Sequence, residues 1–299
     1  MIQIENLTKK FDDHVALDKV NLSVSSGSVY GLVGPNGSGK TTLIKCLCGV
    51  YRVDEGNILI NRTTVYNNAE LKQKVLYIPD DLFFPVTFTP RDMAKFYSNM
   101  YKDFSWERFH ELGKVFQLDE KKRIARFSKG MQKQVAFWVS MSAQPDVIIL
   151  DEPVDGLDPV MRKKVWGIIL QEVEERNITV LISSHNLREL EDVCDHVGIL
   201  HNGEMILQKA LSDMKSDTFK LQVAFSEDLP QELPEKLEIL NHSTMGRVHL
   251  LIVRGKQEEI LKIAESYSPI LCDMVPLTLE EVFIYELGGK GYDFKNILA

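Results

Sequence analysis

A glycine-rich segment, GPNGSGKT from Gly34 to Thr41, has the residue types and spacing of a phosphate-binding loop. It matches the pattern G-x-x-x-x-G-K-[ST], in which glycines let the backbone come close to an anion. The run before it predicts a strand and the run after it predicts a helix, whose first amide groups would face a β-phosphate. Lys40 would contact the β- and γ-phosphates, and the Thr41 hydroxyl would bind Mg2+. The residues predicted to bind nucleotide here are Gly34, Asn36, Gly37, Ser38, Gly39, Lys40, Thr41 and Thr42.

Two adjacent carboxylates, Asp151 and Glu152, follow the apolar run VIIL. Such a run predicts a strand buried on both faces of a parallel sheet, and these sheets place ligands at the carboxyl ends of their strands. Asp151 would hold Mg2+ directly or through a water, and Glu152 would act on an attacking water as general base or orienting group. The alternative is an acid pair at a helix start that only interacts with the helix dipole. The phosphate-binding loop in the same chain favours the catalytic interpretation.

A second segment, RFSKGMQKQ from Arg126, also has features of an anion site. The hydroxyl of Ser128 and the bare backbone of Gly130 stand at the start of a polar, helix-forming run. The alternative is an ordinary helix that a serine side chain caps. The sequence therefore contains two helix starts that could bind phosphate, and the second one needs an explanation.

Three kinds of segment must position these residues. Short apolar strands that alternate with helices, among them VYGLV, VIIL and ITVLISS, predict an α/β core with a mainly parallel sheet. Between about residues 85 and 144, apolar residues recur at helical spacing, which predicts an inserted helical subdomain. After about Leu211, alternating and helical patterns predict a small α+β appendage, with a last helix that begins at the capping box of Thr278 and Glu281.

Composition and charge disfavour several classes of function. The 299 residues carry a net charge of −8, whereas a protein whose main task is to bind nucleic acid needs clustered Lys and Arg. The four cysteines show neither a CxxC pair nor a disulfide spacing, so we expect reduced thiols in the cytosol. The N-terminus lacks a signal-peptide pattern, and no run of about 18 apolar residues occurs. If the protein acts at a membrane, another chain must span it.

With these motifs in this order, Met1 to about Leu211 resembles the ATPase subunits of ATP-binding-cassette (ABC) transporters. The resemblance implies a P-loop NTPase core with an N-terminal antiparallel β subdomain and the inserted helical subdomain. Residues 1–211 would form the nucleotide-binding domain, and residues 212–299 a C-terminal α+β accessory domain. The resemblance also implies ATP and Mg2+ as cofactors and ATP hydrolysis as the activity.

The resemblance gives the second anion site a role. In this family a short signature, Leu-Ser-Gly-Gly-Gln, opens a helix of the helical subdomain and covers the γ-phosphate bound by a second cassette. FSKGM stands at the matching place: Ser128 and Gly130 match, Lys129 replaces the first glycine, and Met131 stands where glutamine is usual. The resemblance therefore implies a head-to-tail dimer around two ATP, as a homodimer or as a heterodimer with a sister subunit.

Three further residues match family positions. His185 follows the predicted strand ITVLISS and aligns with a switch histidine that contacts the γ-phosphate, with a structural histidine as the alternative. Asp158 in VDGLDP resembles a loop at the dimer seam, with an Asp-Pro turn as the alternative. Phe11 matches an aromatic residue that stacks on adenine, with burial in the core as the alternative.

Asp80 departs from the family pattern. The family usually has a glutamine after the strand that here contains VLYIPDD, and that glutamine binds Mg2+ and signals to the transmembrane partner. A carboxylate can still bind Mg2+, but it adds negative charge near a triphosphate. Asp80 is therefore a candidate metal-proximal residue, with Asp81 as its rival and a surface acid pair as the alternative.

The function implied is a transport ATPase that acts through a separate transmembrane permease subunit, without nucleic acid and with membrane contact only through that partner. The chain would then be cytoplasmic and peripheral on the cytoplasmic face of the cell membrane. Its length and appendage resemble stand-alone export subunits for bacitracin, antimicrobial peptides and peptide toxins. The loop DLFFPVTFTP is a natural docking place for the permease, although packing of Phe83 and Phe84 also explains its aromatic residues. The alternatives are a non-transport ABC ATPase and an ATP-dependent regulatory module, and Glu152 with His185 argues against a module without turnover.

Overall fold

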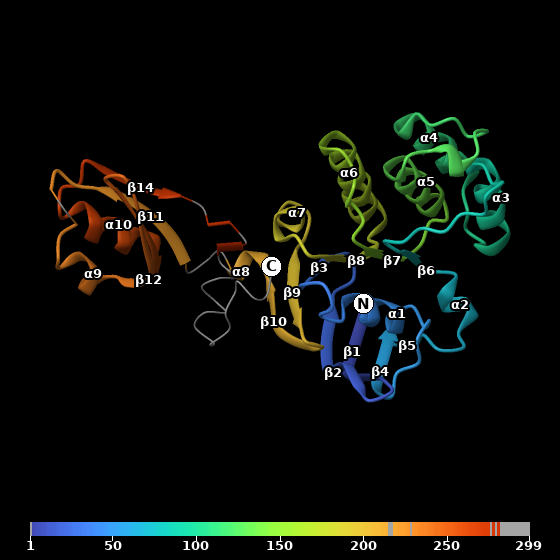
Figure 1. The fold of residues 1–299 in the computed structure, drawn as a ribbon, viewed down its shortest axis with the longest axis horizontal. Coiled ribbons are helices and arrows are strands. Elements are labelled where there is room, and N and C mark those ends of the chain that lie inside the picture. Colours follow the sequence, from blue (N-terminus) through green and yellow to red (C-terminus); the bar gives the residue numbers. More distant parts are fainter. Residues whose placement is uncertain (1, 215–217, 228, 276, 279, 282–299) are drawn as a thin grey trace. The chain divides into compact units, whose positions relative to one another are not determined.

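The computed structural model describes residues 2–214, 218–227, 229–275, 277–278 and 280–281. The chain divides into two compact units, and Figure 1 labels most of their helices and strands. The first unit comprises Met1–His185 and Val193–Gln208, and the second comprises Asn186–Asp192 and Lys209–Ala299. Every residue that the sequence predicts to act on nucleotide belongs to the first unit.

The central sheet of the first unit contains β3 (Val29–Val33), β6 (Val75–Ile78), β7 (Val147–Asp151), β8 (Thr179–Ser184), β9 (His196–His201) and β10 (Glu204–Ala210). The strand order is β10-β9-β3-β8-β7-β6. The pairs β3–β8, β3–β9, β7–β8 and β6–β7 are parallel. β3, β7 and β8 are buried along their whole length, as expected for strands covered on both faces. The predicted α/β core with a mainly parallel sheet is confirmed.

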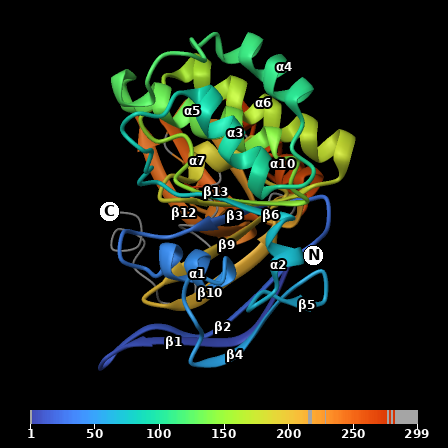
Figure 2. The same cartoon turned by 90° about the vertical axis from the view of Figure 1, so that its right-hand side faces the viewer.

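A second, antiparallel sheet contains β1 (Ile2–Phe11), β2 (His14–Val24), β4 (Glu55–Ile60) and β5 (Thr63–Thr64), in the order β2-β1-β4-β5. The helix α1 (Lys40–Leu47) lies between this sheet and the central sheet (Figure 2). Buried residues of both sheets and of α1 form one hydrophobic core. A short helix, α2 (Ala69–Lys72), precedes β6. The predicted N-terminal antiparallel β subdomain is confirmed.

A helical subdomain is inserted between β6 and β7. It contains α3 (Pro90–Met100), α4 (Trp106–Phe116), the 3-10 turn η1 (Ile124–Arg126) and α5 (Lys129–Ser142). The three α-helices are capped by the residues that precede them, Thr89, Ser105 and Ser128, whose side chains accept a hydrogen bond from the amide three residues later. Phe109 of α4 stacks on Trp138 of α5 with ring centroids 4.5 Å apart, so the two helices share an aromatic core.

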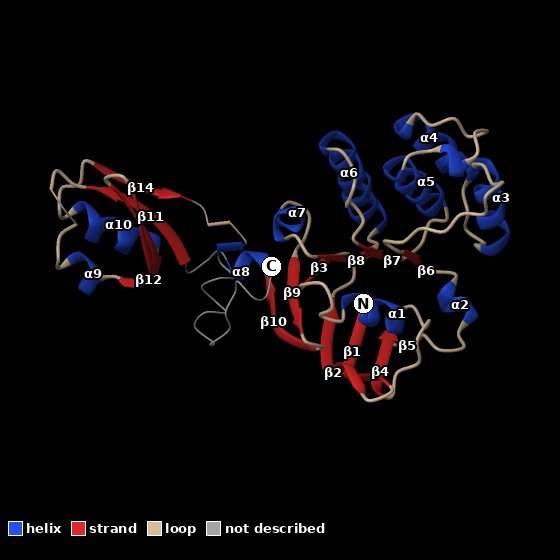
Figure 3. Ribbon diagram, in the orientation of Figure 1, coloured by secondary structure: helices blue, strands red, loops and turns tan. Residues whose placement is uncertain are grey.

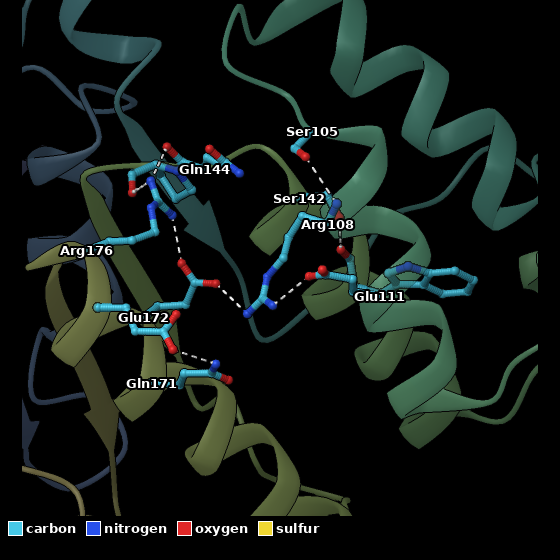
Figure 4. Close-up of polar contacts among 11 residues, drawn as sticks. Ser105, Arg108, Glu111, Ser142, Gln144, Gln171, Glu172 and Arg176 are labelled. Atoms are coloured by element: carbon cyan, nitrogen blue, oxygen red, sulfur yellow. Dashed lines mark hydrogen bonds and ion pairs between the residues drawn. The ribbon is translucent and has the colours of Figure 1, made fainter.

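A buried carboxylate connects the helical subdomain to α6 (Pro159–Arg176), the long helix after β7. Glu172 of α6 accepts hydrogen bonds from Arg108 of α4 at 2.6 Å and from Arg176 at 2.7 Å (Figure 4). Arg176 also donates to the carbonyl oxygen of Gln144, in the loop before β7. Because buried charges are tolerated only when they are paired and hydrogen-bonded, this network fixes α4 against α6.

The second unit is built around a four-stranded antiparallel sheet with the order β12-β13-β11-β14. Figure 3 draws its strands in red. Its strands are β11 (Thr218–Ala224), β12 (Glu238–Met245), β13 (Val248–Arg254) and β14 (Leu271–Val275), and its helices are α7 (Leu187–Glu191), α8 (Leu211–Met214), α9 (Leu233–Lys236) and α10 (Gln257–Glu265). The sheet, α9 and α10 share a hydrophobic core, as the predicted α+β pattern requires. The amides of Thr278 and Glu281 each bond the other residue's side chain, which confirms the capping box. The rest of the predicted last helix, which was expected to end at Leu287, lies outside the described residues.

Candidate active site

Loops at the carboxyl ends of the central strands surround a cleft of about 350 Å³. β3, β6 and β7 are parallel members of one sheet, so the loops that follow them meet at the same edge. The antiparallel sheet contributes the end of β1 and the start of β2. The lining residues are Phe11, His14, Ala16, Pro35, Asn36, Gly37, Gly39, Lys40, Thr41, Thr42, Asp80, Asp151 and Glu152.

The loop between β3 and α1 has a backbone that only glycine adopts easily. Gly37 and Gly39 have φ angles of +82° and +106°. A Cβ atom at Gly34 would lie 2.2 Å from the carbonyl oxygen of Leu200, so this position has no room for a side chain. Ser38 is buried, and its carbonyl oxygen accepts a hydrogen bond from a backbone amide at 2.9 Å. The loop is therefore held in one shape, with the start of α1 at the cleft.

Lys40 brings a positive charge to the cleft from the first position of α1. The residue is only 6% exposed, and its Nζ donates to the carbonyl oxygen of Gly34 at 2.6 Å. Nζ also lies 3.8 Å from Oε1 of Glu152. Burial lowers the pKa of Lys40, while the charges of Glu152 and Asp151 oppose that shift. A buried ammonium at a glycine-rich helix start fits the oxygens of a nucleotide phosphate.

Oxygen donors that suit Mg2+ line the cleft near Lys40. They are the Thr41 hydroxyl and the carboxylates of Asp151 and Asp80. The Ser183 hydroxyl donates to Oδ1 of Asp151 and orients that carboxylate. In the described part of the chain no three His, Cys, Asp or Glu side chains form a metal cage. Because Mg2+ at phosphate sites needs only one or two carboxylates besides the phosphates, the donor set fits Mg2+ bound together with a nucleotide.

Glu152 occupies the turn after β7 and faces two other ionisable side chains. Its φ angle is +47°, in the left-handed region, and its amide donates to the carbonyl oxygen of Ser183 at 3.2 Å. Oε2 of Glu152 lies 2.9 Å from Nδ1 of His185. Burial raises the pKa of Glu152, whereas His185 and Lys40 pull it down. A carboxyl group with a perturbed pKa in contact with other ionisable side chains is typical of catalytic sites.

Phe11 forms one wall of the cleft at the end of β1. Its side chain is 40% exposed, so it is not part of the hydrophobic core. The ring meets Tyr51 edge-to-face at 5.2 Å between centroids, and Nζ of Lys9 lies 5.1 Å from its centroid. His14 lines the same cleft from the start of β2, although no motif in the sequence marks it. The Phe11 ring is therefore held in place, and part of its surface remains exposed for stacking with a flat partner.

Ser128, Gly130 and Asp158 stand at two helix starts outside this cleft. Ser128 caps α5, and Oδ1 of Asp158 accepts hydrogen bonds from two amides in the first turn of α6, both at 3.0 Å. A Cβ atom at Gly130 would lie 3.1 Å from the carbonyl oxygen of Gly156, so the start of α5 packs closely on the loop before α6. Gly130 lines a neighbouring cleft of about 410 Å³.

Asp80 lines both clefts and pairs with a lysine of α5. Its Oδ1 lies 3.0 Å from Nζ of Lys133, and Nζ also donates to the carbonyl oxygen of Glu152 at 2.8 Å. Asp81, the rival candidate, lines the neighbouring cleft but not the cleft that contains Lys40. No local pattern in the sequence marks Lys133, because its partners lie 53 and 19 positions away.

Comparisons with known proteins agree with this geometry. A family model described as ABC transporter matches residues 17–155. The ABC transporter ATP-binding protein YtrB of Bacillus subtilis (strain 168) is 31% identical over 291 residues, which are 97% of this chain and 99% of the relative. The bacitracin transport ATP-binding protein BcrA of Bacillus licheniformis is 32% identical, with 97% of this chain and 98% of the relative covered. A solved structure of an ATP-binding subunit of an ABC transporter covers 72% of this chain and 92% of its own, at a TM-score of 0.67 and 26% identity.

The two full-length relatives extend over both units of the chain. Among the described residues, no helix combines the length and the apolar character that crossing a membrane requires. In this family, ATP-binding subunits dimerise and work with transmembrane permease partners. The phosphate loop, the carboxylates after β7 and these relatives lead to one conclusion: the chain belongs to the ATP-binding subunits of ABC transporters and is an ATPase.

Proposed function

We propose that ATP hydrolysis takes place in the cleft of the first unit, on a water that Glu152 and His185 orient. The observation that carries this proposal is the 2.9 Å contact between Glu152 Oε2 and His185 Nδ1 beside the ammonium of Lys40. Glu152 accepts the proton of the attacking water as general base or orienting group, and His185 holds the carboxylate in place. Lys40 stabilises negative charge on the γ-phosphate.

The remaining cleft residues bind the nucleotide. The amides and side chains of the loop and of the α1 start hold the phosphates, and the Phe11 ring stacks on adenine. Thr41, Asp151 and Asp80 hold Mg2+, which neutralises phosphate charge when it is bound. The loop residues in this role are Gly34, Asn36, Gly37, Ser38, Gly39, Lys40, Thr41 and Thr42.

A second subunit completes each site. Ser128 and Gly130 at the start of α5 contact the γ-phosphate bound by the other cassette, and Asp158 lies at the seam. The position of Ser128 and Asp158 away from their own cleft supports this arrangement, because a helix start that serves another nucleotide must face outward. The partner is a second copy of this chain or a sister subunit.

The transported class is peptides or antimicrobial compounds, moved outward through a separate permease. BcrA is named for bacitracin transport, and a further relative, LnrL of Bacillus subtilis (strain 168), for linearmycin resistance. Phe83 is 86% exposed in the loop after β6, and Phe84 lines an adjacent pocket of about 240 Å³. This loop is the permease contact, so the chain works in the cytoplasm, peripheral on the cytoplasmic face of the membrane. Residues 1–211 form the nucleotide-binding domain, and residues 212–299 form the accessory domain.

Solution mass tests the composite site. The variant Glu152→Gln should bind ATP and hydrolyse it slowly, so light scattering after size exclusion should show the 34.1 kDa chain doubling its mass when Mg-ATP is added. In that background Ser128→Ala should raise the ATP concentration for half-dimerisation by about tenfold, because a hydrogen bond to a charged group is lost.

The matched control is Ser105→Ala, which removes the equivalent cap from α4 and should leave dimerisation unchanged. If Glu152→Gln binds a fluorescent ATP analogue but keeps the mass of one chain, self-dimerisation is wrong and a sister subunit must complete the site. If Ser105→Ala weakens dimerisation as much as Ser128→Ala does, loss of a helix cap explains the result and the role of Ser128 is wrong.

A further inference from the structure

Lys133 joins two parts of the active site that the nucleotide motifs leave unconnected. It lies in the second turn of α5, and its side chain is 12% exposed. Its Nζ donates to Oδ1 of Asp80 at 3.0 Å and to the carbonyl oxygen of Glu152 at 2.8 Å. One ammonium therefore links the loop after β6 to the turn after β7.

The carbonyl that Lys133 holds belongs to the residue proposed to orient water. Glu152 has a φ angle of +47°, a conformation that persists in a glutamate only where the surroundings impose it. Its amide is held by Ser183, whose carbonyl oxygen lies at 3.2 Å and whose Oγ lies at 3.3 Å. On the other side of the residue, the carbonyl accepts from Lys133 at 2.8 Å and from the amide of Asp155 at 3.4 Å. Because the two peptides set the direction of the side chain, Lys133 helps to decide where the carboxylate lies.

Asp80 is the charged partner of Lys133 and lies on the more accessible side of the pair. Its side chain is 52% exposed, and it stands three residues before Phe83 in the loop after β6. Hydrogen bonds between charged groups are shorter and stronger than neutral ones, so Asp80 restricts where the ammonium of Lys133 can sit. A half-exposed ion pair adds little to global stability, so its effect lies in the position of Lys133.

We propose that Lys133 is a positioning residue for Glu152 and that Asp80 holds Lys133 in place, so that loss of either side chain lowers the hydrolysis rate. The inference rests on the proposed role of Glu152. While Asp80 holds Lys133, the carbonyl of Glu152 keeps its anchor and the carboxylate stays directed at the water.

Single-turnover hydrolysis by the full-length chain at high protein concentration tests the proposal, because it measures even slow rates. Lys133→Met keeps most of the side-chain length and removes the donor. We expect its rate constant to fall about 10- to 100-fold, as for a small misplacement of a catalytic group. The dissociation constant for a fluorescent ATP analogue should stay within about twofold, since Lys133 does not line the nucleotide cleft. Lys133→Arg keeps a charged donor and should recover most of the rate.

The pair is tested by combining variants. Asp80→Asn removes the charge and should lower the rate, and it should add little further loss in the Lys133→Met background. Lys114→Met, on the exposed surface of α4, is the matched control and should match the wild type. If Lys133→Met hydrolyses ATP at the wild-type rate, if Lys133→Arg fails to rescue it, or if the Asp80→Asn loss is fully additive, the proposal is wrong. The rates are compared at saturating Mg2+, and an Asp80→Asn loss that disappears there would also overturn the proposal, because Asp80 would then act only through the metal.

Glu152→Gln separates this inference from the proposed function. If Glu152→Gln keeps the wild-type rate, the catalytic role of Glu152 is wrong and the inference falls with it. If Glu152→Gln abolishes hydrolysis while Lys133→Met has no effect, only the positioning role of Lys133 is wrong.

Discussion

Nδ1 of His185 lies 2.9 Å from Oε2 of Glu152, although the two residues are 33 positions apart in the chain. Their proximity follows from the parallel pairing of β7 with β8, whose register places Asp151 opposite Ser183. The chain leaves both strands at the same edge of the sheet, and Glu152 and His185 follow there. The acid and the imidazole therefore belong to one hydrogen-bonded unit.

Glu152→Gln and His185→Ala should each lower kcat by about 10²- to 10⁴-fold, the range expected for loss of a positioned proton acceptor or its support. Because the two groups act as one unit, the double variant should lose little more than the worse single variant. Steady-state phosphate release measures all three. His110→Ala, on the exposed face of α4, is the control. Multiplicative losses in the double variant would show that the two residues act independently.

Glu152→Gln should also raise the Tm of the nucleotide-free protein at pH 7, measured with a chelator present. Burial raises the pKa of Glu152 in the folded state, so folding favours the neutral carboxyl. The favourable contribution of this carboxyl group to folding stability is present at low pH. It is lost as pH rises through the raised pKa, because the folded protein must then hold a buried, charged carboxylate. Glutamine cannot ionise and avoids this cost.

The gain in Tm from Glu152→Gln should shrink below pH 4.5, the ordinary pKa of a glutamate, where the wild-type carboxyl group is also protonated. Glu174→Gln, an exposed substitution on α6, should leave Tm unchanged at pH 7 and below pH 4.5. An equal or lower Tm of Glu152→Gln at pH 7 would mean that the contacts with His185 and Lys40 outweigh burial.

Glu172→Ala should destabilise the first unit by about 3–5 kcal/mol, because Arg108 and Arg176 would keep partly buried charges without their common carboxylate. Chemical denaturation measures the loss. Glu174→Ala, two positions away and exposed, should change the free energy of unfolding by less than about 0.5 kcal/mol. If both variants behave alike, the network in Figure 4 contributes nothing measurable to stability.

Gly113→Ala and Gly167→Ala should change the stability of the folded protein in opposite directions, although both glycines lie inside helices. A Cβ atom at Gly113 would lie 2.8 Å from Cζ2 of Trp138, whose ring is already stacked on Phe109. Overpacking costs about 1–3 kcal/mol and outweighs the gain of roughly 1 kcal/mol in helix propensity. At Gly167 a Cβ atom meets nothing within 4 Å, so only the gain remains. Denaturation midpoints should fall for the first variant and rise for the second; a rise for both would mean that the Trp138 ring moves aside freely.

The sequence by itself determined the features that depend on contiguous residues. The phosphate loop could be predicted because its backbone shape, its amide groups and Lys40 all come from one stretch of eight residues. The run VIIL predicted a fully buried strand, and Asp151 and Glu152 follow it directly. The caps at Ser128 and Thr278 were predictable for the same reason, because a cap and its amide partner lie three residues apart.

Only the tertiary structure decided which distant side chains meet. The bond between Asp80 and Lys133, and the bridge of Glu172 to Arg108, join residues 53 and 64 positions apart. The strand order and the packing of α4 and α5 create these contacts, and hydrophobic periodicity encodes neither of them. Burial likewise depends on the assembled fold, and it raises the pKa of Glu152. The sequence therefore predicted the chemistry of the site, while the fold decided how its acid is held.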